Sequence, residues 1–171
     1  DRYLVSRSRS PEVVEAADIY EYTLDSEPVT PLPQGIRGYG ELVIHGEIYK
    51  ARPDVNAVVH SHSPTIVPFS VTEQPLRAIS SVASFLACGC PVFDFHKVSR
   101  TKGLLITNNE QGAELAKTLG EKPVALMRGH GNLVVAPDIP RVVHRALYTE
   151  INAKQLATAL SFGKPIKYIS E

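Results

Sequence analysis

Apolar side chains recur along this chain at two different spacings, which predict alternating helices and strands. Spacings of three and four residues, together with capping residues, predict helices at 11–16, 40–51, after Ser63-Pro64, at 109–120 and at 138–161. Compact apolar and β-branched runs predict strands at 2–6, 18–24, 55–60, 91–95, 103–107, 123–127 and 133–135. This order predicts an α/β domain whose mixed or antiparallel sheet is covered by helices.

The start of the chain looks abrupt. The first residue is Asp1 rather than Met, and the strand-like run Tyr3-Leu4-Val5 follows with no lead-in helix. We therefore expect the sequence to begin inside a longer protein, without its N-terminal lead-in. The 171 residues suffice for one hydrophobic core. We expect a single domain over residues 1–171.

Composition excludes several classes of partner. The 18 Lys and Arg residues balance the 18 Asp and Glu residues, and no basic block appears, so we expect neither nucleic acid nor a membrane surface as partner. No apolar run approaches the roughly 20 residues that cross a bilayer. The two cysteines, Cys88 and Cys90, lie too close together for an ordinary disulfide. The lack of a disulfide framework favours a cytoplasmic location.

Two histidines, His60 and His62, give the strongest chemical signal in the chain, because they end a β-branched run. Side chains two positions apart on an extended chain point to the same face, so both imidazoles can reach one metal ion. Three protein ligands and one open position are typical of a catalytic zinc site. A His-x-His pair alone is equally consistent with two unliganded histidines.

His130 is the predicted third ligand. It lies in a tight turn between two predicted strands, and Gly129 and Gly131 on either side let the backbone approach a ligand closely. The alternative is that this histidine only caps the turn. Its coincidence with His60 and His62 favours the metal.

Glu41 begins the helix that precedes the His60 strand. A carboxylate there is suited to ligate the metal or to act as a general acid or base beside it. The alternative is that Glu41 only complements the helix dipole in the first turn. His45 follows four residues later on the same helical face, either as support behind the ligands or as a packed core residue.

Arginines supply the candidate contacts to an anionic substrate. Arg128 lies two residues before His130, and a guanidinium fork beside a metal suits a substrate carboxylate. A surface arginine at a strand end is the alternative. Arg7, with its neighbour Ser8, is predicted as a second anion contact. These residues together favour a small-molecule carboxylate as substrate.

Together these residues resemble the class II aldolase/adducin family. The stretch from Glu41 to His62, ELVIHGEIYKARPDVNAVVHSH, is similar to the most specific block of that family. In that block an acidic residue opens a helix, an Arg-Pro-Asp turn follows, and a strand ends in His-x-His. The later Arg128-Gly-His130-Gly matches the position of the third metal ligand. The resemblance covers nearly the whole chain.

The resemblance implies a three-layer α/β/α fold around a central, largely antiparallel sheet. It implies one divalent ion, Zn²⁺ or else Mn²⁺, Co²⁺ or Fe²⁺, on His60, His62 and His130, with Glu41 as a ligand or as the catalytic acid/base. It implies a homotetramer with sites near subunit boundaries. The implied chemistry is that of a lyase in which the metal stabilises an enolate or a similar carbanion.

The substrate-binding positions depart from those of the phosphosugar members. Those members hold phosphate with an early Gly-Asn loop, a Thr/Ser-Pro-Ser/Thr-Gly turn and a Ser-Ser pair before the acid. In this sequence the early loop is missing, residues 6–10 read Ser-Arg-Ser-Arg-Ser, and Tyr39-Gly40 precedes Glu41. The arginines favour a carboxylate-bearing substrate instead. The pattern resembles the family's non-oxidative decarboxylases of dihydroxylated aromatic acids, of the dihydroxyphthalate decarboxylase type.

We therefore expect non-oxidative decarboxylation of a hydroxylated aromatic acid, as in the degradation of aromatic compounds. Two alternatives stay open. One is class II aldolase activity on a hydroxy-keto acid or a sugar phosphate at the same metal. The other belongs to a different class of protein, a non-catalytic scaffold domain like those of the adducins.

Overall fold

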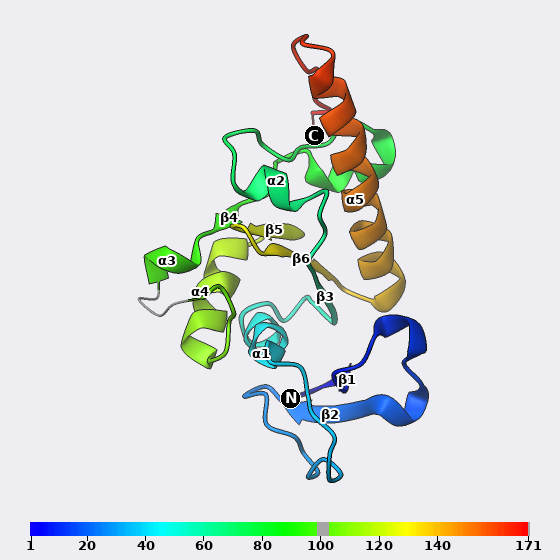
Figure 1. Cartoon of the computed structure of the whole chain (residues 1–171), viewed down its shortest axis with the longest axis vertical. Coiled ribbons are helices and arrows are strands. Elements are labelled where there is room, and N and C mark those ends of the chain that lie inside the picture. The colour runs from blue at the N-terminus through cyan, green and yellow to red at the C-terminus, as the bar shows by residue number, and fades with distance from the viewer. Residues whose placement is uncertain (99–102, 171) are drawn as a thin grey trace. The chain divides into compact units, whose positions relative to one another are not determined.

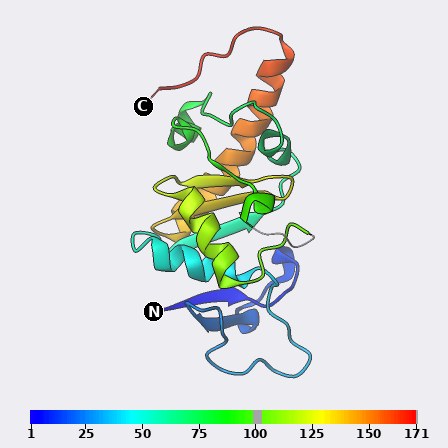
Figure 2. The same cartoon turned by 90° about the vertical axis from the view of Figure 1, so that its left-hand side faces the viewer.

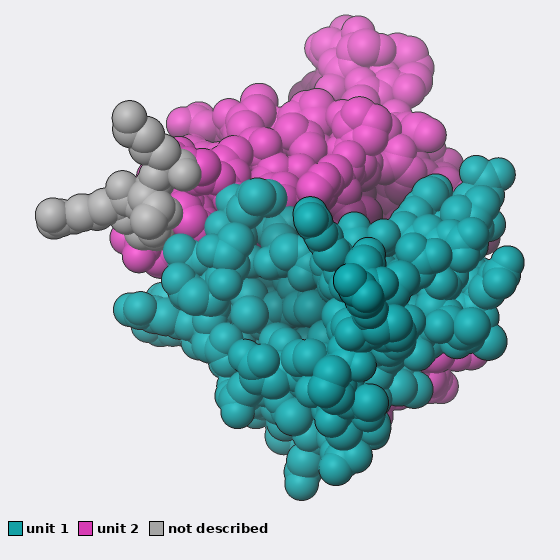
Figure 3. Space-filling view, turned by 60° about the horizontal axis from the view of Figure 1, so that its bottom comes forward, with its two compact units in different colours: residues 1–53, 105–117 teal, residues 54–104, 118–171 magenta. Residues whose placement is uncertain are grey.

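The chain forms two compact units in the computed structural model, which describes residues 1–98 and 103–170. The first, here called the hairpin unit, consists of residues 1–53 and 105–117. The second, here called the sheet unit, consists of residues 54–104 and 118–171. Figure 3 distinguishes the two units by colour. The expectation of a single domain stays a prediction.

The hairpin unit begins with two antiparallel strands, β1 (Arg2–Ser6) and β2 (Ile19–Thr23). Tyr3 pairs with Tyr22 in the middle of the hairpin, and both side chains are buried. The helix predicted at 11–16 is wrong, because two separate 3-10 turns form there. The second turn is closed by a capping box in which the carboxylate of Asp18 accepts a hydrogen bond from the backbone N–H of Glu15.

Helices α1 (Leu42–Ala51) and α4 (Asn109–Leu119) form where the helical spacing predicts them. A Cβ on Gly46 of α1 would lie 2.2 Å from the carbonyl oxygen of Leu24, so only glycine allows this close approach. Gly120 follows α4 with φ +53°, the left-handed conformation that ends many helices.

The sheet unit contains a four-stranded sheet in the order β3-β6-β5-β4. β6 pairs antiparallel with β3 and with β5, whereas β4 pairs parallel with β5, so the sheet is mixed. Figures 1 and 2 show these strands side by side. The strand bounds are Ala57–Ser61 (β3), Val92–Phe93 (β4), Val124–Met127 (β5) and Gly131–Ala136 (β6).

Three helices belong to the sheet unit: α2 (Val67–Ser70), α3 (Phe95–Val98) and the long α5 (Ile139–Ser161). α5 packs on β6 and β3, and α2 packs on β5 and β6. The core between them is apolar, and every residue of β5 and β6 is buried. Continuous apolar strands of this kind are typical of a sheet covered by helices.

α5 begins and ends as its sequence predicts. The carboxylate of Asp138 caps the helix by accepting a hydrogen bond of 2.8 Å from the backbone N–H of Arg141. Gly163, with φ +63°, follows its end. Within the described residues no helix is both long enough and apolar enough to cross a membrane.

Two predicted strands need correction. Residues 103–107 form no strand, because the backbone N–H of Ile106 donates to a side chain, Glu41, rather than to a neighbouring strand. The strand predicted at 91–95 shortens to Val92–Phe93, because the carboxylate of Asp94 accepts the backbone N–H of His96 and starts α3.

Candidate metal centre

The three predicted histidine ligands lie at one end of the sheet. His60 is the fourth residue of β3, His62 follows that strand directly, and His130 occupies the turn between β5 and β6. Gly131 makes the approach possible, because a Cβ there would lie 2.1 Å from the carbonyl oxygen of Ser61. The turn that carries His130 is thereby brought against the end of β3.

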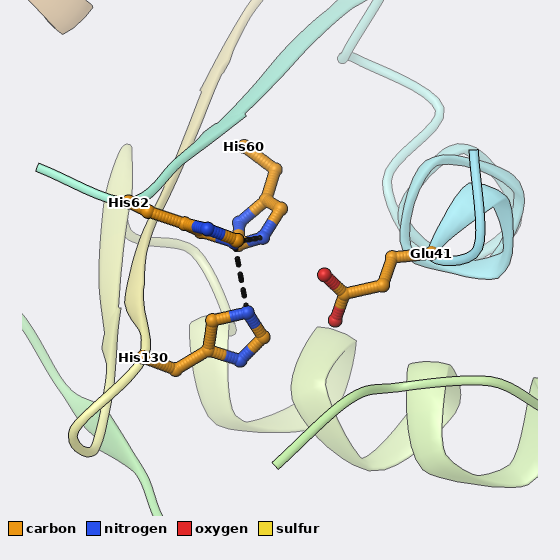
Figure 4. A group of neighbouring side chains, drawn as sticks. All are labelled: Glu41, His60, His62 and His130. Carbon is orange, nitrogen blue, oxygen red and sulfur yellow. Dashed lines mark hydrogen bonds between the residues drawn. The ribbon is translucent and has the colours of Figure 1, made fainter. Parts of the chain in front are cut away.

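The three imidazole rings point toward one another (Figure 4). Nε2 of His62 lies 2.9 Å from Nε2 of His60 and 2.9 Å from Nε2 of His130. The ring centroids are 4.6 to 5.1 Å apart. His60 and His130 are half-buried and His62 is exposed, so the site is open to solvent on one side.

Backbone carbonyls fix the orientation of two of these rings. Nδ1 of His60 lies 3.1 Å from the carbonyl oxygen of Asn132, and Nδ1 of His130 lies 3.0 Å from that of Leu104. A carbonyl oxygen only accepts hydrogen bonds, so both Nδ1 atoms carry the proton. In the neutral rings Nε2 of each then presents a lone pair toward His62.

Three converging Nε2 atoms suit a cation. Neutral imidazole nitrogen is a common ligand of divalent metal ions, and a single ion at the centre can bind all three. Tetrahedral zinc with Zn–N bonds of about 2.0–2.1 Å places its nitrogens about 3.3 Å apart, so the rings need to separate by only about 0.4 Å. The donor set therefore fits a divalent metal ion.

Glu41, also drawn in Figure 4, belongs to the hairpin unit. It occupies the N-cap position of α1, and its carboxylate accepts a hydrogen bond of 3.0 Å from the backbone N–H of Ile106. His45 lies one turn further along α1, and its ring stacks on Tyr3 at 6.1 Å with 9° between the planes. The roles of Glu41 and His45 stay predictions.

Arg128 is the first residue of the turn that carries His130. Its Nη1 lies 2.9 Å from Oδ2 of Asp94, and 54% of its side chain is exposed. The sequence did not predict Asp94 as a site residue, because Asp94 lay within the predicted strand 91–95. The one sequence signal for such a role was its position directly after an apolar run.

Arg7 forms an ion pair within the hairpin unit. Its Nε lies 2.5 Å from Oδ1 of Asp18, and Nη1 of Arg9 lies 2.6 Å from Oδ2. The hydrogen bond from Arg7, followed by that from the backbone of Glu15, holds the pKa of Asp18 well below its usual value. Ser8 is exposed, and its backbone N–H donates to the carbonyl oxygen of Arg37. The anion-binding roles predicted for Arg7 and Ser8 are not tested by these contacts.

A second contact near the histidines was also missed. The hydroxyl of Ser63, which follows His62, donates to the carboxylate of Glu150 on α5. Burial alone would raise the pKa of Glu150. Hydrogen bonds from Ser63, Thr65 and Lys154 together lower this pKa by more than burial raises it, so the net shift is downward. This bond ties the segment after β3 to the long helix.

Comparison with known proteins identifies relatives over most of the chain. The sequence profile of the class II aldolase and adducin N-terminal domain matches residues 1–157. Decarboxylase tropJ of Talaromyces stipitatus is 38% identical over 167 residues, covering 90% of this chain and 62% of tropJ. The 3,4-dihydroxyphthalate decarboxylase of Arthrobacter keyseri is 31% identical over 176 residues, covering 96% of this chain and 68% of that protein. The chain thus spans 62% to 68% of the length of these two relatives.

Solved structures confirm the fold class. The crystal structure of L-fuculose-1-phosphate aldolase from Thermus thermophilus matches with a TM-score of 0.72 and 22% identity, over 95% of this chain and 80% of that one. At this identity the likeness shows the fold alone. The predicted α/β fold with a central sheet is confirmed, and the sheet is mixed rather than purely antiparallel.

Proposed function

The chain belongs to the class II aldolase and adducin family, and from this premise we propose that it is a divalent-metal-dependent carbon–carbon lyase. The observation that carries the proposal is that Nε2 of His62 lies 2.9 Å from Nε2 of both His60 and His130, whose rings are oriented by backbone carbonyls. Zinc is the proposed ion, because three imidazole nitrogens and one open position suit it. Mn²⁺, Co²⁺ and Fe²⁺ accept the same ligands and are the alternatives.

The proposed reaction is the non-oxidative decarboxylation of a hydroxylated aromatic carboxylic acid. Two relatives that match 90% and 96% of this chain are named as decarboxylases. The second is named as a 3,4-dihydroxyphthalate decarboxylase. Arg7 and Arg9 both pair with one carboxylate, that of Asp18. A carboxylate-bearing substrate is complementary to such arginines.

Each proposed residue has a distinct role. When bound, a divalent ion supplies a Lewis acid that polarises the oxygens of the substrate. His60, His62 and His130 hold that ion. Arg128 holds a substrate carboxylate with its guanidinium fork.

Glu41 is the proposed acid. When carbon dioxide leaves, the electron pair of the broken carbon–carbon bond stays on the ring carbon, which then takes a proton from the Glu41 carboxyl group. The N–H of Ile106 donates to one carboxylate oxygen, which favours a fixed direction for the other.

Aldol cleavage is the second candidate, because the fold matches that of an L-fuculose-1-phosphate aldolase and the same three histidines suit both reactions. The adducin-like scaffold is the third. The paired arginines favour decarboxylation over aldol cleavage, and the ligand set favours either enzyme over the scaffold.

Product and metal analyses separate the three functions. Metal-loaded protein is incubated separately with 3,4-dihydroxyphthalate, with a hydroxy-keto acid and with a sugar phosphate, and carbon dioxide, aromatic products and aldehydes are quantified. Release of carbon dioxide without an aldehyde supports the decarboxylase, whereas an aldehyde from a hydroxy-keto acid or a sugar phosphate supports the aldolase. Purified protein without a stoichiometric divalent ion would exclude both enzymes and leave the scaffold.

We also propose a homotetramer in the cytoplasm. Neither Cys88 nor Cys90 forms a disulfide, which suits a reducing compartment. Light scattering on a sizing column measures the mass of the assembly directly, and a monomer at micromolar concentration would contradict the tetramer.

A further inference from the structure

Asp94 and Arg128 occupy equivalent positions on neighbouring strands. β4 and β5 run parallel, with Phe93 opposite Met127, and the backbone N–H of Arg128 donates to the carbonyl oxygen of Phe93 at 2.9 Å. Each residue is the first one after its strand. The carboxyl ends of parallel strands meet at one edge, so the two side chains emerge together.

The carboxylate of Asp94 is held at both oxygens. Oδ1 accepts the backbone N–H of His96 at 3.2 Å in the first turn of α3, and Oδ2 accepts Nη1 of Arg128 at 2.9 Å. Only 12% of the Asp94 side chain is exposed, against 54% of Arg128. A nearly buried, fixed anion therefore anchors a cation that is largely open to solvent.

The backbone around Arg128 is fixed as well. The N–H of Gly129 donates to the hydroxyl of Ser70 at 2.9 Å, and that of His130 donates to the carbonyl oxygen of Met127 at 3.0 Å. The backbone of Arg128 thus belongs to a rigid turn, two residues before a proposed metal ligand. Without the contact to Asp94, the Arg128 side chain would sample many rotamers, and ordering it when a substrate binds would cost free energy.

We infer that Asp94 is a positioning residue that sets the Arg128 guanidinium to receive the second carboxylate of an aromatic dicarboxylic acid. The inference rests on the proposed function, since it needs an aromatic acid at the histidine site. A guanidinium has five N–H donors in a planar fork, so one edge can face Asp94 while another receives a substrate carboxylate. Asp94 then acts on substrate selection through Arg128, without touching the substrate.

The test compares Asp94→Asn with Asp138→Asn. Asp138 also caps a helix and forms an ion pair with a following arginine, Arg141. Asparagine caps helices about as well as aspartate, so both substitutions keep the cap and weaken only the ion pair. Asp138→Asn therefore controls for the general effect of the substitution on stability and charge.

The kinetic readout uses two substrates, 3,4-dihydroxyphthalate and a dihydroxybenzoate that lacks the second carboxylate. Asp94→Asn should raise KM for the dicarboxylate about tenfold, with a smaller change in kcat, and leave the monocarboxylate and the metal content unchanged. Arg128→Lys should do the same, and the double variant should be no worse than Arg128→Lys alone. Equal losses for both substrates, or multiplied losses in the double variant, would overturn the inference.

A binding measurement separates this inference from the proposed function. Phthalate, which lacks the hydroxyl groups, is titrated calorimetrically into metal-loaded protein, so that no turnover is required. A Kd about tenfold higher for Asp94→Asn, with no change for Asp138→Asn, supports the positioning role even if no carbon dioxide is released. An unchanged Kd for Asp94→Asn overturns it, whatever the reaction proves to be.

Discussion

The substitution Gly131→Ala should damage the metal site without removing any ligand. The added Cβ would lie 2.1 Å from the carbonyl oxygen of Ser61 and 3.1 Å from Cα of His62, where ordinary contact is 3.4–4 Å. Both neighbours are backbone atoms of the segment that carries two ligands, so relief requires that segment to shift by roughly 1 Å.

The size of the effect follows from the tolerance of metal sites. Ligand distances are held within about 0.2 Å, and changes that disturb the support of metal ligands cost about 10–100-fold in metal affinity. We therefore expect the metal affinity of Gly131→Ala to fall about 10–100-fold, or about 1.4–2.7 kcal/mol. The metal-free protein should lose about 1–3 kcal/mol of stability to overpacking. Competition with a chromogenic chelator measures the affinity, and urea unfolding of the metal-free protein measures the stability.

Gly129→Ala is the matched control in the same turn. Its φ is +66°, but among the described residues the added Cβ would meet just the Leu104 and Val71 side chains, at 3.8 and 3.9 Å. It should cost about 1–2 kcal/mol of stability for the left-handed backbone and change metal affinity less than about threefold. If Gly131→Ala bound the metal as tightly as Gly129→Ala, the proposed packing of the turn against the end of β3 would be refuted.

Three further predictions concern other parts of the chain. Glu41→Gln should keep the metal and the melting temperature but lower turnover about 10²–10⁴-fold, and full activity would show that the proton donor lies elsewhere. The depressed pKa of Asp18 stabilises the fold above its unfolded-state value of about 3.9, and this stabilisation is lost as the pH falls below it. Asp18→Asn should therefore flatten the acid side of the stability curve measured by urea unfolding, and an unaltered acid side would contradict the ion pair with Arg7. Burial raises the pKa of the Cys90 thiol to about 12 whereas Cys88 is exposed, so brief iodoacetamide treatment should label Cys88 well before Cys90 in peptide mass spectra. Equal labelling rates would contradict the raised pKa.

The cluster of three histidines was predictable because each of them depends on local sequence. The spacing of His60 and His62 puts both on one face of an extended strand wherever that strand lies. The glycines around His130 likewise indicate a tight turn without knowledge of the fold. Helices α1, α4 and α5 carry their own spacing and end signals, and they formed close to the predicted bounds.

Features that depend on strand pairing could not be predicted. The Asp94–Arg128 pair exists because β4 lies parallel to β5, and the sequence of neither strand specifies its neighbour. Residues 103–107 have strand-like composition, yet Ile106 bonds to a side chain instead of a strand. Likewise the proton on Nδ1 of His60 is set by a carbonyl of β6, 72 positions away.

The metal content of the purified protein tests the central claim most directly. Elemental mass spectrometry should find about one divalent ion per chain in the wild type and none in His60→Ala or His130→Ala. His144→Ala, which removes an exposed histidine from α5, should keep the full content. A wild type without a stoichiometric ion, or a His130→Ala variant that retains it, would contradict the proposed three-histidine site.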